Sequence, residues 1–472
     1  MDLTWSEREE AFRTEAREWL EANVPHDLAP DGTRAGLAAH LEWERKLYDA
    51  RWAVVSWPWR YGGRDATLWE WLIFEEEYYR AGGPPRVTQN GIFLLAPTLF
   101  EFGTQEQQDR YLPRMAAAED LWCQGWSEPG AGSDLAAVRS SAVRDSERGG
   151  WLLPGQKTWT TRGASCTHLF GLFRTDPAAM RHHGLTYFLV PLDIPDVTVR
   201  GFARLDGEEE FAEVFVEDAF VPDANVLGAV NQGWRVAMSA TGSERGLTLR
   251  SPGRFLHSAG RLIELYRERP SLAQRDRVVQ PWIDAQSYQM CTLAQVTGIT
   301  DGRRTGPESS LNKLFWSELD VRLHETALAL LGEDGQVDSP WTRGFLFSPA
   351  GPNYAGTNEV QRNVVAERVL GLPRKQARDA FSASTRPHWR CATPPPGCSR
   401  RMGSMRTAWY RSSRKSAAAR PGHAPLDVAP ASSDDLLMLI FTSGTSGKEK
   451  AGAGRPEPGA RAQAHGRPGD RD

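Results

Sequence analysis

Residues 122–136 read WCQGWSEPGAGSDLA, an apolar and aromatic run that gives way to a loop of small and hydroxyl residues. Pro129 fixes its own φ and biases the preceding residue away from helix. Gly130 and Gly132 allow positive φ and a close approach to the backbone. Such a loop can lay backbone N–H groups and Ser hydroxyls against a planar or anionic ligand. A surface turn with an Asx-type hydrogen bond at Asp134 is the alternative, and is the commoner outcome for such spacing.

The composition bounds the class of protein. The chain has 472 residues, 40% hydrophobic and 25% charged, which is enough for two or three domains with a sizeable core. A net charge of -4 provides no basic field for nucleic acid or an anionic membrane. The five cysteines are scattered without a CxxC pair, which fits a reducing compartment and argues against a disulfide framework or a zinc ribbon.

The N-terminus, MDLTWSEREEAFRTEAREWLEANVP, is acidic and amphipathic. It matches neither a signal peptide nor a transit peptide. No apolar run reaches the 18 or more residues of a membrane span. We therefore expect a cytoplasmic protein with no nucleic-acid partner, no membrane span and no metal site.

About the first 120 residues have the pattern of an all-helical domain. Thr4 can open the first helix with a capping box, its hydroxyl accepting from the N–H of Glu7. Apolar residues at helical spacing, with Gly and Pro between the runs, predict four further helices, at 40–50, 68–81, 92–102 and 105–118.

Residues 121–230 change to the pattern of strands. β-Branched and aromatic residues alternate or run together, and Pro, Gly and Asp separate the runs at short intervals. The predicted strands lie at 150–161, 168–175, 185–192, 197–205 and 212–222. This pattern predicts an all-β domain, either a barrel or a sandwich.

Residues 231–375 return to long helical patterns, and residues 381–420 show no helical or strand period. The helices are predicted at 232–250, 256–267, 278–296, 310–331 and 359–370. Residues 381–420 contain many Arg and Lys with Pro, Ser and Gly but no Asp or Glu, a composition typical of disorder. We therefore predict an α+β multidomain chain with helical, β and helical domains at 1–120, 121–230 and 231–375, followed by a disordered tail at 376–472.

Within this domain order, the opening stretch resembles the flavin- and substrate-binding loop of the acyl-CoA dehydrogenases. The resemblance covers residues 1 to about 375 and rests on several stretches in the order of that family: SWPWRYGG (56–63), FEFGTQEQQDRYLPRM (100–115), GQKTWTT (155–161), EVFVEDAFVPDANVLG (213–228) and YAGTNEVQRNVVAERVLGLP (354–373). It implies a middle β barrel, a C-terminal four-helix bundle, bound FAD and usually a homotetramer. No GxGxxG follows a strand, so a Rossmann flavin site is not expected.

The resemblance assigns a flavin wall to the β domain. It implies that Trp126, Ser127 and Ser133 lie on the flavin and acyl-thioester side of the loop. Trp159 would flank the isoalloxazine ring and Thr161 would hydrogen-bond near flavin N5. A ring that accepts hydride needs a flat apolar wall and donors where negative charge grows. For Trp159 the alternative is a buried strand aromatic.

A second set of matching positions lies near residue 357. Gly356, Thr357 and Glu359 correspond to positions that contact the cofactor in the family. Gly356 would let the backbone approach the cofactor closely. The alternative is a helix N-cap at Thr357 or Asn358, and both functions are compatible.

The catalytic base departs from the commonest pattern of the family. Most members carry the glutamate immediately before the Gly-Thr pair, where this chain has Ala355. A minority, the isovaleryl and long-chain types, place it on a helix of the third domain. The matching stretch ATGSERGLTL (240–249) puts Glu244 there, with Arg245 beside it. The alternative is a solvated helix carboxylate paired with Arg245 or Arg250.

The implied reaction is α,β-dehydrogenation of an acyl-CoA to the trans-2-enoyl-CoA. Glu244 would take the α proton while the β hydride passes to flavin N5, and electrons would leave to an electron-transfer flavoprotein. Ala355 keeps the backbone N–H that supports the thioester oxygen. Two alternatives are an oxidase and a non-catalytic FAD- or CoA-binding homologue. The latter is favoured by Ala355 and by a 267–286 region that lacks the family's Arg-x-x-Phe-Gly stretch.

The tail contains a second resemblance. Within the stretch DDLLMLIFTSGTSGKEKA (434–451), residues 441–451 resemble the phosphate-binding loop of adenylate-forming acyl-CoA ligases, with Glu449 in place of a proline and Ala451 in place of a glycine. A loop without its scaffold does not stay ordered, so we expect no working ATP site. The surrounding Arg-, Pro- and Gly-rich sequence suggests a gene-fusion or frameshift product.

Overall fold

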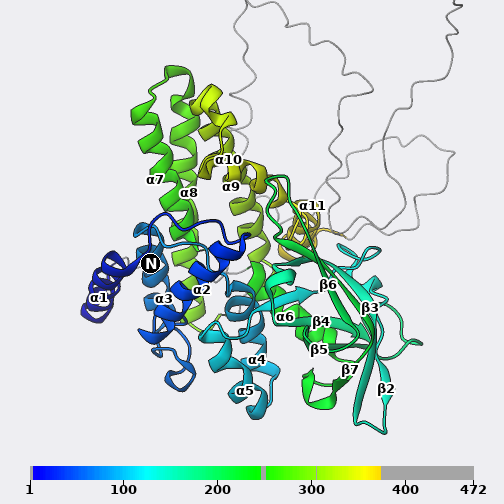
Figure 1. The fold of residues 1–472 in the computed structure, drawn as a ribbon. Coiled ribbons are helices and arrows are strands. Elements are labelled where there is room, and N and C mark those ends of the chain that lie inside the picture. Colours follow the sequence, from blue (N-terminus) through cyan, green and yellow to red (C-terminus); the bar gives the residue numbers. More distant parts are fainter. Residues whose placement is uncertain (1–3, 246–250, 304–305, 374–472) are drawn as a thin grey trace, which may run out of the picture. The chain divides into compact units, whose positions relative to one another are not determined.

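The computed structural model describes residues 4–245, 251–303 and 306–373. The predicted disordered tail and the ligase-like segment at 434–451 lie outside the described residues. Figure 1 shows three successive parts of the chain, with helices first (blue to cyan), then strands (cyan to green), then helices (green to yellow). The predicted helical–β–helical order is confirmed.

The first part consists of helices and short helical turns. They are α1 (Glu7–Asn23), α2 (Arg34–Asp49), η1 (Trp59–Tyr61), α3 (Leu68–Arg80), η2 (Asn90–Leu95), α4 (Ala96–Phe102) and α5 (Gln105–Ala116). α1 begins at a capping box in which the Ser6 hydroxyl accepts from the Glu9 N–H. The predicted box at Thr4 is therefore wrong by two residues. The helix predicted at 92–102 begins instead as the π-helical turn η2.

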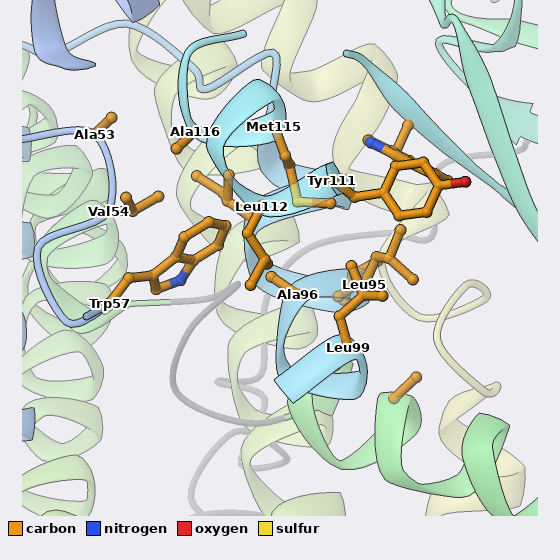
Figure 2. Packing of buried hydrophobic residues seen from close by; sticks show 14 of the residues in the cluster. Ala53, Val54, Trp57, Leu95, Ala96, Leu99, Tyr111, Leu112, Met115 and Ala116 are labelled. Carbon is orange, nitrogen blue, oxygen red and sulfur yellow. The ribbon is translucent and has the colours of Figure 1, made fainter. Parts of the chain in front are cut away.

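Large apolar side chains pack these helices together. Figure 2 shows Leu95, Ala96 and Leu99 beside Tyr111 and other side chains of α5. On another side of the same core cluster, Trp52 stacks on the ring of Phe74 at 5.5 Å. Each fully buried side chain of this size contributes roughly 1.5–3 kcal/mol to folding.

The second part is built from two four-stranded sheets. Their strands are β1 (Trp122–Gly125), β2 (Val143–Asp145), β3 (Gly150–Thr161), β4 (His168–Arg174), β5 (Leu185–Pro191), β6 (Val197–Phe202), β7 (Phe211–Pro222) and β8 (Val226–Leu227). One sheet has the order β1-β4-β5-β8 and the other β2-β3-β7-β6. The β1–β4 pair is parallel and the other pairs are antiparallel.

The two sheets share one core but do not close into a ring. Leu169 and Phe188 of one sheet lie in the same buried cluster as Leu153 and Val214 of the other. Within the described residues, no strand ladder joins the two sheets. β2 and β8, at the sheet edges, pair over three and two residues, which is too short for a closing ladder. The domain is therefore a sandwich, and the closed barrel implied by the family resemblance is wrong.

The third part is helical. Its helices are α6 (Gly233–Arg245), α7 (Pro252–Glu268), α8 (Arg275–Thr300), α9 (Ser309–Leu331), α10 (Pro340–Phe347) and α11 (Asn358–Val364). α7, α8 and α9 pack against one another, and α10 and α11 pack on α9 (Figure 1). α10 was not predicted. Of the helices in the described part of the chain, none combines the length and the apolar composition that a bilayer span requires.

Candidate active site

The loop after β1 is tied to both sheets. The Trp126 indole N–H donates to the Tyr187 hydroxyl of β5 at 3.3 Å. The Ser127 carbonyl accepts from the N–H of Thr158 in β3 at 2.9 Å. Ser133 is exposed at the far end of the loop. Trp126 and Ser127 are therefore fixed by β3 and β5, while Ser133 faces solvent.

A buried ion pair supports this loop. The Lys157 ammonium, on β3, donates to Glu128 Oε1 and to the Leu172 carbonyl, both at 2.8 Å. Glu128 also accepts from the N–H groups of Arg139 and Ser140, at 2.6 and 3.0 Å. Burial opposes ionisation of Glu128, but the charge of Lys157 and these hydrogen bonds together hold its pKa below its ordinary value. The turn is therefore rigid at its base.

Trp159 has the least usual backbone of the candidate residues. Its φ is +58°, at the point where the register of β3 against β7 shifts. The ring is 38% exposed and lies edge-on to Phe202 and Phe211, with centroids at 5.2 and 5.6 Å. A bulky residue at positive φ is an outlier, and such strain clusters at functional sites. The bulge leaves the ring partly in solvent, so the buried strand aromatic considered above is wrong.

The end of β3 is anchored to the helical part of the chain. Thr161 is half-buried and ends the strand. The next residue, Arg162, has a φ of +56° and is buried. Its guanidinium donates to Asp31 at 2.6 and 2.9 Å. This contact holds the strand end that presents Thr161.

The loop before α11 exposes backbone donors. Ala355 and Gly356 have φ values of +56° and +80°. Gln361 Nε2 donates to their carbonyls at 3.1 and 3.4 Å. The N–H of one peptide points opposite to its carbonyl, so the N–H groups of Gly356 and Thr357 point away from Gln361. In the described part of the chain, no protein acceptor takes a backbone hydrogen bond from the N–H of Ala355.

A buried polar cluster on α9 holds the start of α11. Lys313 Nζ and Ser317 Oγ donate to Asn358 Oδ1 at 2.7 and 3.1 Å, and all three side chains are buried. Thr357 is the N-cap of α11, its hydroxyl accepting from the Val360 N–H. The N-cap at Thr357 is thus confirmed, with Asn358 as the first helical residue.

The remaining predicted residues lie on helices. Glu359 is exposed, 3.9 Å from Arg362. Glu244 and Arg245 form the last turn of α6. α6 packs on η2, α4 and β5, and also on α9, the helix that holds Asn358. α9 therefore connects the element that carries Glu244 with the loop that carries Ala355. Within the described residues, no hydrogen bond joins that loop to Ser127.

Sequence reasoning missed the Glu128–Lys157 pair, the Gln361 clamp and the Lys313 cluster. A signal existed for Lys157, because a lysine in the middle of a strand of apolar and β-branched residues needs a buried partner. A buried lysine on α9 offered the same signal at Lys313.

The donor set fits a flavin. Trp159 supplies a flat, partly exposed ring, and Ser127 and Thr161 supply hydroxyls. Ala355 supplies a backbone N–H that no described residue accepts. These are the groups that a ring accepting hydride requires. In the part of the chain that the structure describes, no cluster of His, Cys, Asp and Glu could hold a metal ion.

Comparison with known proteins identifies the class. The chain matches the N-terminal domain of the acyl-CoA dehydrogenases over residues 6–119, their middle domain over 123–218 and their C-terminal domain over 231–370. The acyl-CoA dehydrogenase IpdE1 of Mycolicibacterium smegmatis is 39% identical over 389 residues, covering 77% of this chain and 98% of that protein. The chain belongs to the acyl-CoA dehydrogenase family.

Solved structures show the same fold. The chain is similar to the Tcur3481–Tcur3483 steroid ACAD, with a TM-score of 0.71 and 24% identity over 79% of this chain and all of that one. It is also similar to the ChsE4–ChsE5 complex from Mycobacterium tuberculosis, with a TM-score of 0.68 and 26% identity over 79% of this chain and 100% of that one. The predicted FAD-dependent acyl-CoA dehydrogenase activity is confirmed at the level of the family.

Proposed function

We propose that Glu244 is the base of this acyl-CoA dehydrogenase and removes the α proton of the acyl-CoA thioester. Ala355, at the position of the usual glutamate, has no carboxyl to do so. α6, which carries Glu244, packs on α9, and α9 also holds Asn358 just after the Ala355 loop, which supports their acting on one substrate. FAD, when bound, would supply the acceptor for the β hydride, and the product would be the trans-2-enoyl-CoA. Arg245, beside the base, would balance its charge.

The observation that carries this proposal is the backbone N–H of Ala355, which has no acceptor among the described residues. An α proton of a thioester is too weakly acidic for an unaided carboxylate, so the thioester oxygen needs donors as charge develops. Ala355 offers such a donor in a strained, held conformation. Gln361, which fixes the adjoining carbonyls, is a positioning residue.

The flavin would be held by residues from two parts of the chain. Trp159 would provide the flat wall, and the hydroxyl and amide groups would hold the ring and the substrate thioester. The proposed cofactor-binding residues are Trp126, Ser127, Ser133, Trp159, Thr161, Gly356, Thr357 and Glu359.

Anaerobic addition of a panel of acyl-CoA esters to the purified flavoprotein tests the activity. We expect the flavin absorbance to bleach with at least one ester. A non-catalytic FAD- or CoA-binding homologue would show no bleaching with any ester. Under air, an oxidase would release one peroxide per enoyl product, whereas a dehydrogenase would pass its electrons to an electron-transfer flavoprotein.

We also propose a cytoplasmic homo-oligomer, a tetramer or a dimer. An exposed apolar stripe on α8 supports it: Val279, Trp282, Ile283 and Met290 lie on one face and are 39–44% exposed. Stripes of this kind mark interaction surfaces. A second candidate is a complex with another acyl-CoA dehydrogenase chain. The departure from the Arg-x-x-Phe-Gly stretch favours it, and the similar ChsE4–ChsE5 structure is a complex of two differently named chains.

The proposed domain limits are 1–120, 121–230 and 231–375, with a tail at 376–472. We propose that the ligase-like loop at 434–451 is a remnant without ATP chemistry. Incubation with ATP, CoA and fatty acids should then release no pyrophosphate. Resequencing the DNA that encodes residues 375–472 would show whether a frameshift or fusion created the tail.

A further inference from the structure

A cavity of about 390 Å³ lies among the N-terminal helices. This volume falls within the range of small-molecule sites. Its walls are the loop 53–58, α3 and the η2–α4 segment, and most of its lining is apolar, including Trp57, Trp71, Phe74, Ile92, Phe93 and Phe100. Figure 2 shows Val54 and Trp57 on the loop that forms one of these walls. The cavity is therefore shaped for a bulky apolar group.

One carboxyl in this lining has no protein partner. Glu75, on α3, is 5% exposed. Within the described residues, no hydrogen bond or ion pair engages it, although three other acidic residues of α3 pair with arginines (Glu70, Glu76 and Glu77). An unpaired buried carboxyl is costly, so Glu75 requires a ligand or a proton.

The cationic side chain next to Glu75 already has other hydrogen-bond partners. Arg86 also lines the cavity, but its Nε donates to Glu44 Oε2 at 2.8 Å and its Nη2 donates to the Ala53 carbonyl at 2.9 Å. Glu44 and Arg86 are both buried and cancel each other's charge. Burial raises the pKa of Glu75 to about 7, against the opposing charge of Arg86. Among the described residues that line it, the cavity thus offers a hydrogen-bond donor to a neutral oxygen and no free cation to a carboxylate.

One wall of the cavity packs against an element of the proposed active site. η2, which contributes Ile92 and Phe93 to the lining, packs on α6, the helix that ends with Glu244 and Arg245. The following helix, α7, begins against α3. A Cβ added at Gly253 would lie 2.8 Å from the Glu75 carbonyl oxygen. The backbone at Glu75 is therefore in contact with the start of α7, the helix that follows Glu244 and α6 in the sequence.

We propose that this cavity receives the far end of the acyl group and that the Glu75 carboxyl donates a hydrogen bond to a neutral oxygen there. The substrate class is then an acyl-CoA with a bulky apolar acyl group that carries a ketone or hydroxyl distant from the thioester. A plain hydrocarbon chain would leave Glu75 unpaired, and a distal carboxylate would meet no free cation. This assignment rests on the proposed dehydrogenation by Glu244.

Three matched substrates test the assignment: 3-cyclohexylpropanoyl-CoA, its 4-oxocyclohexyl analogue and its 4-carboxycyclohexyl analogue. We expect wild-type kcat/KM to favour the oxo ester by about tenfold or more, the effect of one buried hydrogen bond. Glu75→Leu should lose this preference, and Glu75→Gln should keep it because an amide can donate. Glu18→Leu, at an exposed position of α1, is the matched control and should keep the wild-type ratio.

A pH series on the wild-type enzyme also tests whether the protonated Glu75 carboxyl donates this hydrogen bond. Between about pH 6 and about pH 8 the carboxyl loses its proton, so the oxo preference should fall, while Glu75→Gln should show no such fall. The other titratable groups around Glu75 are held by partners: Arg86 by Glu44, the Tyr78 hydroxyl by the Pro84 carbonyl, and Arg254 of α7 by Asp320.

Equal kcat/KM for the oxo and unsubstituted esters in the wild-type enzyme would overturn the proposal, as would a preference for the carboxylate ester. An oxo preference that Glu75→Leu retains would overturn it as well. Equilibrium binding of the same esters separates this claim from the role of Glu244. If Glu244 is not the base, that part of the function fails while the oxo preference in binding persists.

Discussion

Trp159 adopts a backbone conformation that a bulky side chain seldom tolerates. Its φ of +58° costs roughly 1–3 kcal/mol. The β3–β7 ladder is paired on both sides of the bulge, and this pairing holds the strained residue in place. Since the ring remains 38% exposed, the strain presents a flat surface to a ligand instead of filling a core.

Replacing Trp159 by alanine should therefore weaken FAD binding more than it weakens the fold. We expect the affinity of the apoprotein for FAD to fall about fivefold to tenfold, the value of one lost aromatic contact of about 1 kcal/mol. FAD titration of the apoprotein with a parallel thermal melt measures both effects. Trp59→Ala removes another exposed tryptophan, 56% exposed, and should leave FAD affinity unchanged. Equal losses in the two variants would contradict the role of Trp159.

Gln361 should matter for catalysis because it orients the Ala355–Gly356 peptides. Gln361→Leu removes both of its hydrogen bonds to the loop and also a buried Oε1 that has no partner among the described residues. We expect kcat to fall about tenfold, or 1.4 kcal/mol, with KM nearly unchanged. Steady-state kinetics measure the split. Asn363→Leu, at an exposed position of the same helix, should change neither constant, and a loss confined to KM would contradict the positioning role.

The family resemblance, more than residue types alone, singled out the candidate loop, and neither predicted its support. Glu128 and Lys157 pair across 29 positions of sequence, and no local pattern shows which buried charges will meet. Trp159 could be named from the family resemblance, whereas its positive φ depends on the register of β3 against β7, which only the folded sheet determines.

At the scale of elements, the sequence predicted which residues lie within a helix or strand better than it predicted where that helix or strand begins and ends. β3 runs over Gly150–Thr161 as expected, because Gly149 and Gly163 bound a stretch rich in apolar and β-branched residues. β1, β2 and β8 span two to four residues, too few to show alternation. Both Thr4–Glu7 and Ser6–Glu9 fit the capping-box spacing, so local sequence could not choose the start of α1.

The α1–α3 contact should make the protein sensitive to acid. Burial alone would raise the pKa of Glu77, but hydrogen bonds from Arg17, Arg80 and Arg13 lower it to about 2. A lowered pKa contributes stability that is full above the unfolded value of about 4.5 and is lost as the pH falls toward about 2. The urea midpoint of the wild-type protein should therefore drop between about pH 5 and about pH 3.

Glu77→Gln lacks this titration, so its midpoint should be lower at about pH 5 and should change less on acidification. Glu18→Gln, at an exposed site on α1, should follow the wild-type protein. Parallel pH profiles for the wild-type protein and Glu77→Gln would show that the arginine cluster contributes nothing.

At the scale of the whole molecule, the order of the domains could be predicted from the change between helical and strand patterns and from the family resemblance. Whether the two sheets close into a barrel could not be predicted. Closure depends on pairing between strands of the two sheets, which lie far apart in sequence. The helical domains were predictable because their apolar periodicity is long. The placement of α6 and α11 on α9 was not, because it depends on buried contacts such as Lys313–Asn358.

The exposed stripe of α8 should be an interface in solution. Ile283→Glu places a charge in the stripe and should shift the protein to smaller species in light scattering coupled to gel filtration. Gln280→Glu adds the same charge at an exposed polar position of α8 and should not. An unchanged mass for Ile283→Glu would place the interface elsewhere.

The central claim is that this chain dehydrogenates acyl-CoA with Glu244, not residue 355, as its base. The most direct measurement is anaerobic flavin bleaching by an acyl-CoA substrate in purified Glu244→Gln. We predict that this variant binds FAD as the wild-type protein does but is not bleached, while Glu325→Gln, at an exposed position of α9, bleaches normally. Bleaching of Glu244→Gln at the wild-type rate would contradict the claim.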